Sequence, residues 1–216
     1  MKLLSDMQMN MTKSSVNEFK KALETHALDY QVKITTEAIE RLAQYYELLS
    51  AWNPRLHLVA PCSPREFATR HILESLLLLS FLPLAARIAD IGSGAGLPII
   101  PCLIARKDIK GALIEASNKK AVFLREALHL TGTAKSATVI AERFEKVTIT
   151  DVQFVTCRAL ERFAETLPRL AKWSPPASTL LLFGGEKLRA AINNADLPFT
   201  EIQIPYSQRR FLFAVT

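Results

Sequence analysis

Cysteine is scarce in this sequence. Its three cysteines, Cys62, Cys102 and Cys157, lie far apart and at no spacing that would pair them as metal ligands. An odd, sparse set of this kind is typical of reduced thiols in a cytosol. We therefore expect a cytoplasmic protein with no metal site.

Long apolar runs are also missing. Only Leu3 and Leu4 stand between the first lysine and the polar residues that follow, which is too short for the apolar region of a signal peptide. The apolar run over residues 72–84 contains Glu74 and Pro83 and falls short of a membrane span. We find no internal repeat or low-complexity segment, and we expect no membrane partner.

The composition is that of an ordinary globular protein. Of the 216 residues, 49% are hydrophobic and 22% are charged, enough for one α/β domain with an appendage. The net charge of +6 suggests a polyanionic partner. Charge alone does not distinguish such a protein from one that is merely basic.

Three of the seven glycines alternate with small residues in one stretch, as Gly92, Gly94 and Gly96. An apolar run that contains Asp90 precedes them and a helix-compatible segment follows, so the pattern predicts a strand, a tight turn and a helix N-terminus. Glycine permits positive φ and removes Cβ atoms where a ligand lies against the backbone. The turn is therefore a candidate binding loop, and a glycine loop without a ligand is the alternative.

The spacing of this loop indicates which ligand it holds. It reads G-x-G-x-G, whereas a dinucleotide-binding loop reads G-x-G-x-x-G. Asp90, two residues before the first glycine, would repel a phosphate and attract a cation. S-adenosylmethionine carries a sulfonium and an ammonium group and fits both facts. Glu115 ends the next apolar run, where an acid accepts hydrogen bonds from ribose hydroxyls.

Helical patterns dominate the chain before this loop. Apolar residues recur at three- and four-residue steps over 16–27, 36–53 and 67–79, and Ser63–Glu66 is a capping box with proline at the first helical position. We predict an N-terminal helical cap over residues 1–83, with residues 1–15 frayed.

A basic cluster lies in the connecting segments of this cap, beside the expected cofactor cleft. A solvated surface is the alternative for the cluster, and a hydrogen-bonded structural role is the alternative for its second histidine. The members are Arg55, His57, Arg65, Arg70 and His71.

From Ile88 onward, strand patterns alternate with helical ones, which predicts a parallel sheet covered on both faces. The last two apolar runs flank a turn and predict an antiparallel hairpin, which favours a methyltransferase sheet over an all-parallel dinucleotide fold. We expect an α/β fold with a doubly wound, mostly parallel, seven-stranded sheet, forming a methyltransferase domain over residues 84–216. The expected strands are 87–91, 111–115, 137–141, 152–156, 178–183, 199–204 and 210–215.

Two helices of this domain are predicted in detail. The first covers residues 97–106 with Pro98 in its first turn. The second covers residues 118–130, with its inward side chains at Val122, Phe123, Ala127 and Leu130.

Two further positions follow strand ends. Residues 142–145 come just after the third strand, where an adenine ring can be held in a doubly wound sheet. Arg158 follows the fourth strand and is expected over the cleft. Both are predicted to lie at the site.

Taken together, these residues resemble the glucose-inhibited-division protein B family, the bacterial guanine-N7 methyltransferases of small-subunit (16S) ribosomal RNA. The resemblance covers about residues 36–185. It depends on these segments: Trp52-Asn53, Arg70–Ser75, Asp90–Pro98, Lys119–Leu124, Arg143–Glu145 and Arg158-Ala159.

The resemblance implies a role for each candidate residue. The loop residues would wrap the methionine part of S-adenosylmethionine, Glu115 would bind its ribose, and Arg158 would lie at the methyl-transfer end. Phe144 and Glu145 would flank adenine, while Arg70 and His71 would order the cap or meet the RNA backbone. The loop residues are Asp90, Gly92, Gly94, Gly96 and Leu97.

The chain departs from the family pattern at four places. Gly184-Gly185 stands where a Lys-Gly pair is usual, so Lys187 is the nearest substitute for an RNA-binding lysine. His57 replaces an asparagine in a segment that also lacks a threonine, Glu115 replaces an aspartate, and the Gly-Leu-Pro-Gly loop ends in isoleucine. The changes at Gly184 and His57 fall on the expected substrate side, beside the candidate RNA-binding residues.

The implied reaction needs no general base, because guanine N7 has an in-plane lone pair and no proton. The catalytic role is therefore alignment, with Arg158 as the best candidate, and the sequence has no acid–base constellation or Asn-Pro-Pro-Tyr signature. We expect a monomer that acts on ribosomal RNA or the small ribosomal subunit. The alternatives are cytosine-C5 methylation through Cys157, a non-catalytic RNA-binding or assembly protein, and a nicotinamide-dependent oxidoreductase.

Overall fold

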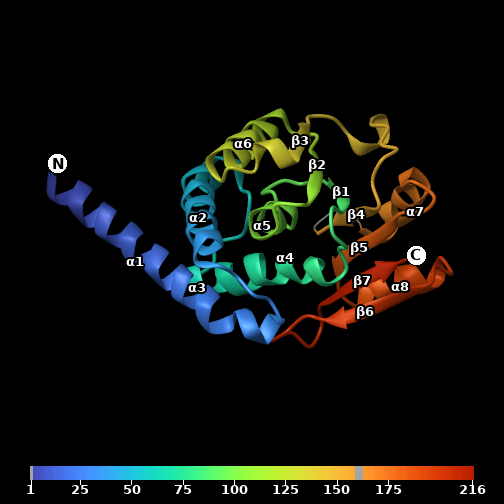
Figure 1. Ribbon diagram of the computed structural model, residues 1–216, viewed down its shortest axis with the longest axis horizontal. Coiled ribbons are helices and arrows are strands. Elements are labelled where there is room, and N and C mark those ends of the chain that lie inside the picture. The colour runs from blue at the N-terminus through green and yellow to red at the C-terminus, as the bar shows by residue number, and fades with distance from the viewer. Residues whose placement is uncertain (1, 159–162) are drawn as a thin grey trace.

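Seven strands form one mixed sheet in the computed structural model, which describes residues 2–158 and 163–216 (Figure 1). The strand order is β3-β2-β1-β4-β5-β7-β6; the first five strands run parallel, and β7 is antiparallel to both of its neighbours. This confirms the predicted fold. The strands are β1 (Arg87–Ile91), β2 (Lys110–Ile114), β3 (Ala137–Ile140), β4 (Phe154–Cys157), β5 (Thr179–Gly184), β6 (Phe199–Gln203) and β7 (Phe211–Val215).

Successive strand residues point to opposite faces, and each face has its own hydrophobic core. Ile88 and Leu113 belong to one core, whereas their neighbours Ala89 and Ile114 belong to the other. Helices cover both faces (Figure 1). The first face carries α1 (Lys2–His26), α2 (Thr36–Leu56), α5 (Ile99–Ala105) and α6 (Asn118–Leu130), and the second carries α7 (Phe163–Trp173) and α8 (Glu186–Asn194).

The prediction for α6 was correct in its bounds but wrong in part of its buried face. Val122 and Leu130 are 50% and 46% exposed. The buried stripe instead follows Ala121, Leu124 and Leu128 at three- and four-residue steps. Val122 lies one residue away from that stripe, about 100° around the helix, so it points to solvent.

Two helix limits in the N-terminal part also differ from prediction. Residues 2–15, predicted to be frayed, belong to α1, and α2 continues through Pro54 to Leu56. The cap at Thr35 is confirmed, since its hydroxyl accepts a hydrogen bond from the Ala38 amide at 3.2 Å.

Residues 64–80 form a continuous helical segment with a wide turn in its middle. It consists of α3 (Pro64–Glu66), the π-helical η2 (Phe67–Leu73), α4 (Glu74–Leu76) and the 3₁₀-helical η3 (Leu77–Ser80). In the π turn the Glu74 amide donates to the Thr69 carbonyl, five residues back. The Arg70 carbonyl therefore loses its usual α-helical donor and is available to another group.

The helical segments pack directly on the sheet. The larger hydrophobic core joins Leu42 and Ile72 to Ile88 and Leu181, so it contains residues from both sides of residue 83. The division into a cap and a methyltransferase domain stays a prediction. No helix in the described ranges is both long and apolar enough to span a bilayer.

Candidate active site

The glycine turn after β1 has the predicted backbone. Gly92, Gly94 and Gly96 have φ values of +67°, +50° and +83°, a region that favours glycine. A Cβ on Gly96 would also lie 2.3 Å from Cδ1 of Ile100. The predicted helix start is wrong, however: α5 begins at Ile99, because Leu97 and Pro98 still belong to the turn that Gly96 makes.

Glu115 ties this turn to the second strand. It lies just past β2, and its two carboxylate oxygens accept hydrogen bonds from the amides of Gly94 (2.8 Å) and Ser117 (2.7 Å). Each carboxylate oxygen has a further lone pair available to a ligand hydroxyl. The acid therefore lies against the glycine loop, and its role toward ribose stays a prediction.

A cleft of about 310 Å³ opens beside the turn. It lies at the carboxyl ends of β1 and β4, the edge where ligands bind in open parallel sheets. Two parts of the lining were not predicted: the segment 58–60 and Lys120. The lining residues are Leu58, Val59, Ala60, His71, Gly92, Ser93, Gly94, Ala95, Leu97, Lys120 and Arg158.

Asp90 lies next to this cleft, within the sheet and out of contact with solvent. Its side chain is fully buried, and neither carboxylate oxygen has a hydrogen-bond partner among the described residues. Burial raises the pKa of Asp90 well above its usual value. An unpartnered buried carboxylate beside a glycine loop points to a cationic ligand.

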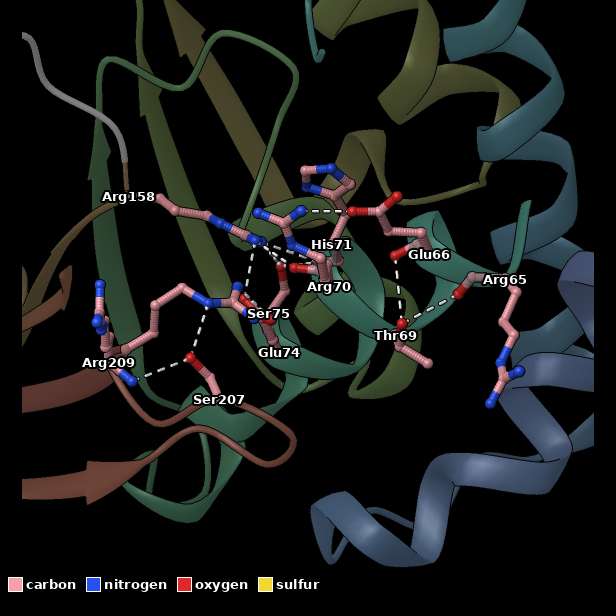
Figure 2. Close-up of polar contacts among 11 residues, drawn as sticks. Arg65, Glu66, Thr69, Arg70, His71, Glu74, Ser75, Arg158, Ser207 and Arg209 are labelled. Carbon is pink, nitrogen blue, oxygen red and sulfur yellow. Dashed lines mark hydrogen bonds and ion pairs between the residues drawn. The ribbon is translucent and has the colours of Figure 1, made fainter. Parts of the chain in front are cut away.

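Arg158 follows β4 and reaches across to the helical segment 64–80 (Figure 2). Its guanidinium donates to the carbonyls of Arg70 and His71 and to Oγ of Ser75, the last two at 3.1 Å. The π turn that releases the Arg70 carbonyl thus supplies an acceptor for Arg158. Because these acceptors all belong to the segment 64–80, the geometry favours a role for Arg158, the predicted catalytic candidate, in positioning that segment. Ala159, the second residue of its motif, lies outside the described residues.

Glu74 is the acid that joins Arg158 to the terminal hairpin (Figure 2). Its buried carboxylate accepts from Nη2 of Arg158 at 3.1 Å and from Nη1 of Arg210, just before β7, at 2.5 Å. We call these three residues the Glu74 cluster. The sequence analysis noted Glu74 as an acid that interrupts an apolar run and as part of the motif Arg70–Ser75, but gave it no role. The interruption was the available signal for a buried ion pair.

His71 is a neutral group in the cleft. Burial, with Arg158 and Arg70 nearby, lowers the pKa of His71 to about 3, and its Nδ1 has no partner among the described residues. Its ring packs against Phe67 with centroids 5.1 Å apart. In the RNA-free protein the imidazole of His71 is therefore uncharged at neutral pH.

Helix α2 supports the walls of the cleft. The buried Tyr45 hydroxyl donates to the Ala95 carbonyl of the glycine turn at 2.5 Å. Asn53 fixes the 58–60 segment, because its side-chain amide exchanges two hydrogen bonds of 3.0 Å with the backbone of Val59. Sequence reasoning found Asn53 only as part of a motif and missed Tyr45.

The predicted adenine-flanking residues lie outside the cleft lining. Phe144 is buried and meets Trp173 edge to face, with ring centroids 5.5 Å apart. Glu145 forms an ion pair with Arg169 of α7. Their role toward adenine stays a prediction.

The predicted RNA-binding residues are spread over several surfaces. Arg55 and His57 are exposed at the end of α2, and Lys187 is exposed at the start of α8. Arg70 pairs with Glu66. Of the predicted RNA-binding residues, only His71 lines the cleft.

Two other sequence features have structural explanations. Cys157 is fully buried in the second hydrophobic core and does not line the cleft, so the geometry gives no support to cytosine attack through this thiol. At Gly184 a Cβ would lie 2.8 Å from Cβ of Leu188. Close packing of α8 on β5 therefore accounts for glycine at this position.

Comparison with known proteins gives one consistent result. A sequence model of the family described as rRNA small subunit methyltransferase G matches residues 38–208. Proteins named ribosomal RNA small subunit methyltransferase G are similar to this chain over much of their length. The one from Halorhodospira halophila is 32% identical, with 83% of this chain and 84% of the relative covered. The one from Xanthomonas campestris (strain B100) is 38% identical, with 67% and 68% covered.

Solved structures share the fold at low sequence identity. A SAM-dependent methyltransferase from Aquifex aeolicus superposes with a TM-score of 0.55 at 14% identity, covering 79% of this chain and 97% of the other. An RNA methyltransferase from Salinibacter ruber, in complex with S-adenosyl-L-homocysteine, gives 0.54 at 16% identity, covering 73% and 93%.

Asp90→Asn should stabilise the ligand-free protein at neutral pH. Because the folded-state pKa of Asp90 is raised, the native state binds the proton more tightly, and wild-type stability falls as pH rises above the unfolded value near 3.8. The asparagine variant lacks this decline. Urea unfolding between pH 4 and 8 measures the difference.

Asp108→Asn is the matched control, for which we expect the opposite change in stability at neutral pH. Arg106 lowers the pKa of Asp108 to about 2, so the stabilisation by Asp108 is present above pH near 3.8 and is lost as pH falls toward 2. This variant should be less stable than wild type at pH 7. A shift of the same sign in both variants would contradict the assignment for Asp90.

Glu74→Gln should destabilise the fold strongly. The substitution keeps the shape but leaves the Arg158 and Arg210 guanidinium groups without their common anion, for a loss of about 3–5 kcal/mol in unfolding free energy. Glu186→Gln breaks an exposed pair with Arg189 and should cost about 1 kcal/mol or less. Equal losses in denaturant titrations would show that the Glu74 cluster is no stronger than a surface pair.

Proposed function

The chain belongs to the rRNA small subunit methyltransferase G family, and from this membership and the geometry of the cleft we propose that it methylates N7 of a guanine in 16S ribosomal RNA. The methyl donor is S-adenosylmethionine. The observation that carries the proposal is the juxtaposition of a positive-φ glycine turn, the buried unpartnered Asp90 and the cleft beside them.

The residues at the cleft fit this cofactor. Gly92, Gly94 and Gly96 leave no Cβ between the backbone and a bound methionine moiety, and Asp90 supplies negative charge for its cationic end. Glu115 has free lone pairs for ribose hydroxyls. In this proposal Leu97 completes the wrap around the methionine, and Phe144 and Glu145 take the adenine from the segment after β3.

When bound, S-adenosylmethionine supplies an electrophilic methyl group on a positively charged sulfur. The in-plane lone pair of guanine N7 would form the N–C bond as the C–S bond breaks, so the positive charge would move from sulfur to the guanine. No proton moves in this step, so the protein needs no general base.

The chain's own residues align the reactants and keep the cleft dry. The apolar side chains of Leu58, Val59 and Leu97 line the space where the base would enter, which limits competing water. Arg158 fixes the helical segment that carries His71, and His71 offers a neutral hydrogen-bonding group. Near-attack geometry, with about 3 Å between the reacting atoms, then accounts for the rate.

Ribosomal RNA as substrate agrees with the net charge of +6. We propose that the protein acts as a monomer in the cytoplasm, on RNA within or destined for the small ribosomal subunit. Arg55, His57, Arg70 and Lys187 are proposed as RNA contacts outside the cleft lining.

Methyl transfer from radiolabelled S-adenosylmethionine tests the proposal directly. The acceptors are ribosomal RNA and small ribosomal subunits from cells that lack the endogenous modification. We expect the label in 7-methylguanosine after nuclease digestion. Label in another nucleoside would contradict the N7 assignment, and cofactor binding without any transfer would favour a non-catalytic RNA-binding protein.

Gly94→Val should weaken cofactor binding by at least about tenfold. A β-branched residue at a φ of +50° strains the turn by more than 1 kcal/mol and places methyl groups beside Glu115. Isothermal titration with S-adenosylmethionine measures the affinity. Gly111→Ala, in strand β2 and without positive φ, is the control that should retain it. Unchanged affinity in Gly94→Val would remove this loop from the cofactor site.

A further inference from the structure

A second hollow of about 370 Å³ lies next to the cleft. It is formed by the end of α1, the start of the helical segment 64–80 and the turn of the terminal hairpin. Its aromatic and basic side chains are those of His26, Tyr30, Arg65, Arg70, Tyr206 and Arg210. We call this the second hollow.

Tyr206 presents its ring to solvent in this hollow. The residue is 71% exposed and has a φ of +59°, which is uncommon for a bulky side chain. Its hydroxyl donates to Asp29 at 2.5 Å, and the ring of His26 meets it edge to face with centroids 5.9 Å apart. The protein therefore holds a large aromatic side chain in a strained conformation without burying it, which is a feature of functional sites.

The hollow also has an excess of positive charge. Three arginines line it against one lining acid, Glu66, which is paired with Arg70. Arg210 is paired with the buried Glu74, and Asp29 lies at the Tyr206 hydroxyl, so the unpaired positive charge is that of Arg65. The guanidinium of Arg65 makes no hydrogen bond or ion pair with any side chain in the described ranges, and Figure 2 shows it pointing away from the Glu66–Arg70 pair. An unpaired arginine beside an exposed aromatic ring suits a phosphate next to a stacked base.

The second hollow and the cleft are lined by two residues that are adjacent in the sequence. Arg70 lines the hollow, whereas the next residue, His71, lines the cleft. Arg158 donates to the backbone carbonyls of both and so fixes the boundary between the two spaces. A chain of nucleotides with one base in the cleft would bring a neighbouring nucleotide to the hollow.

We propose that the second hollow binds a nucleotide that flanks the methylated guanine in the RNA chain. Its base stacks on Tyr206, and its phosphates contact Arg65 and Arg70. This inference rests on the proposed function for its substrate class, RNA. A single-stranded segment is required, because stacking on a side chain needs an unpaired base.

Binding of a fluorescein-labelled, single-stranded RNA 12-mer, followed by anisotropy, tests the inference without any need for methyl transfer. Tyr206→Ala should weaken binding about fivefold or more, the effect expected for the loss of one stacked base. Tyr206→Phe keeps the ring and should remain within about twofold of wild type. Arg65→Ala should weaken binding and reduce the slope of log K against log salt by about 1.

Arg87→Ala is the charge-matched control. Arg87 begins β1, at the edge of the sheet opposite to the cleft, and is paired with Asp151. It should change RNA affinity less than Arg65→Ala does. Titration with S-adenosylmethionine should give wild-type affinity for all four variants, which shows that they are folded.

Several outcomes would overturn the inference. If Tyr206→Ala binds RNA with wild-type affinity, no base stacks on Tyr206. If Arg65→Ala and Arg87→Ala lose the same affinity, Arg65 contributes only through the overall charge of the protein. Weaker binding of Tyr206→Ala to the small ribosomal subunit but not to naked RNA would assign the hollow to a ribosomal protein. If Tyr206 proves necessary for RNA binding but no 7-methylguanosine forms, the proposed function fails. The second hollow then remains an RNA-binding surface, but its place beside a methylated guanine is overturned.

Discussion

One buried carboxylate connects the three parts of the molecule that meet at the cleft. Glu74, on the helical segment 64–80, accepts from Arg158 after β4 and from Arg210 before β7. Glu74 and Arg158 are largely removed from water, with side chains 2% and 14% exposed, whereas Arg210 keeps a third of its side chain exposed. Either buried charge would be costly to keep without its partner. The position of Arg158, the boundary between cleft and second hollow, and the docking of the hairpin therefore depend on the same interaction.

One buried acid at the cleft is unsatisfied, whereas the backbone around it is relaxed. The unpartnered Asp90 is unfavourable in the ligand-free protein, while the three positive-φ residues of the turn are glycines, which adopt this conformation without strain. Helix α2 stabilises this arrangement through the bond from Tyr45 to Ala95. The N-terminal helices thus take part in building the site, in addition to covering one face of the sheet.

Much of the fold could be predicted, and the errors have physical causes. β1 and α6 were predicted with their observed bounds, and the glycine turn has its expected conformation. Val122 of α6 was wrongly placed inside, because one apolar residue beside a stripe cannot be told from a member of it without the neighbouring helix. The charge state of His71 was also beyond prediction, since it depends on burial and on Arg158, 87 residues away.

By itself, the sequence determined the succession of strands and helices in the α/β unit, the glycine turn and the family, because each of these depends on residues that are close together in the chain. The tertiary structure alone decided the rest: the Glu74 cluster, the isolation of Asp90 and the pairing of the second hollow with the cleft. Each of these depends on which groups, far apart in the sequence, are buried next to one another. Their burial and contacts set their charge states and hydrogen bonds, and these contacts cannot be inferred from a short stretch of sequence.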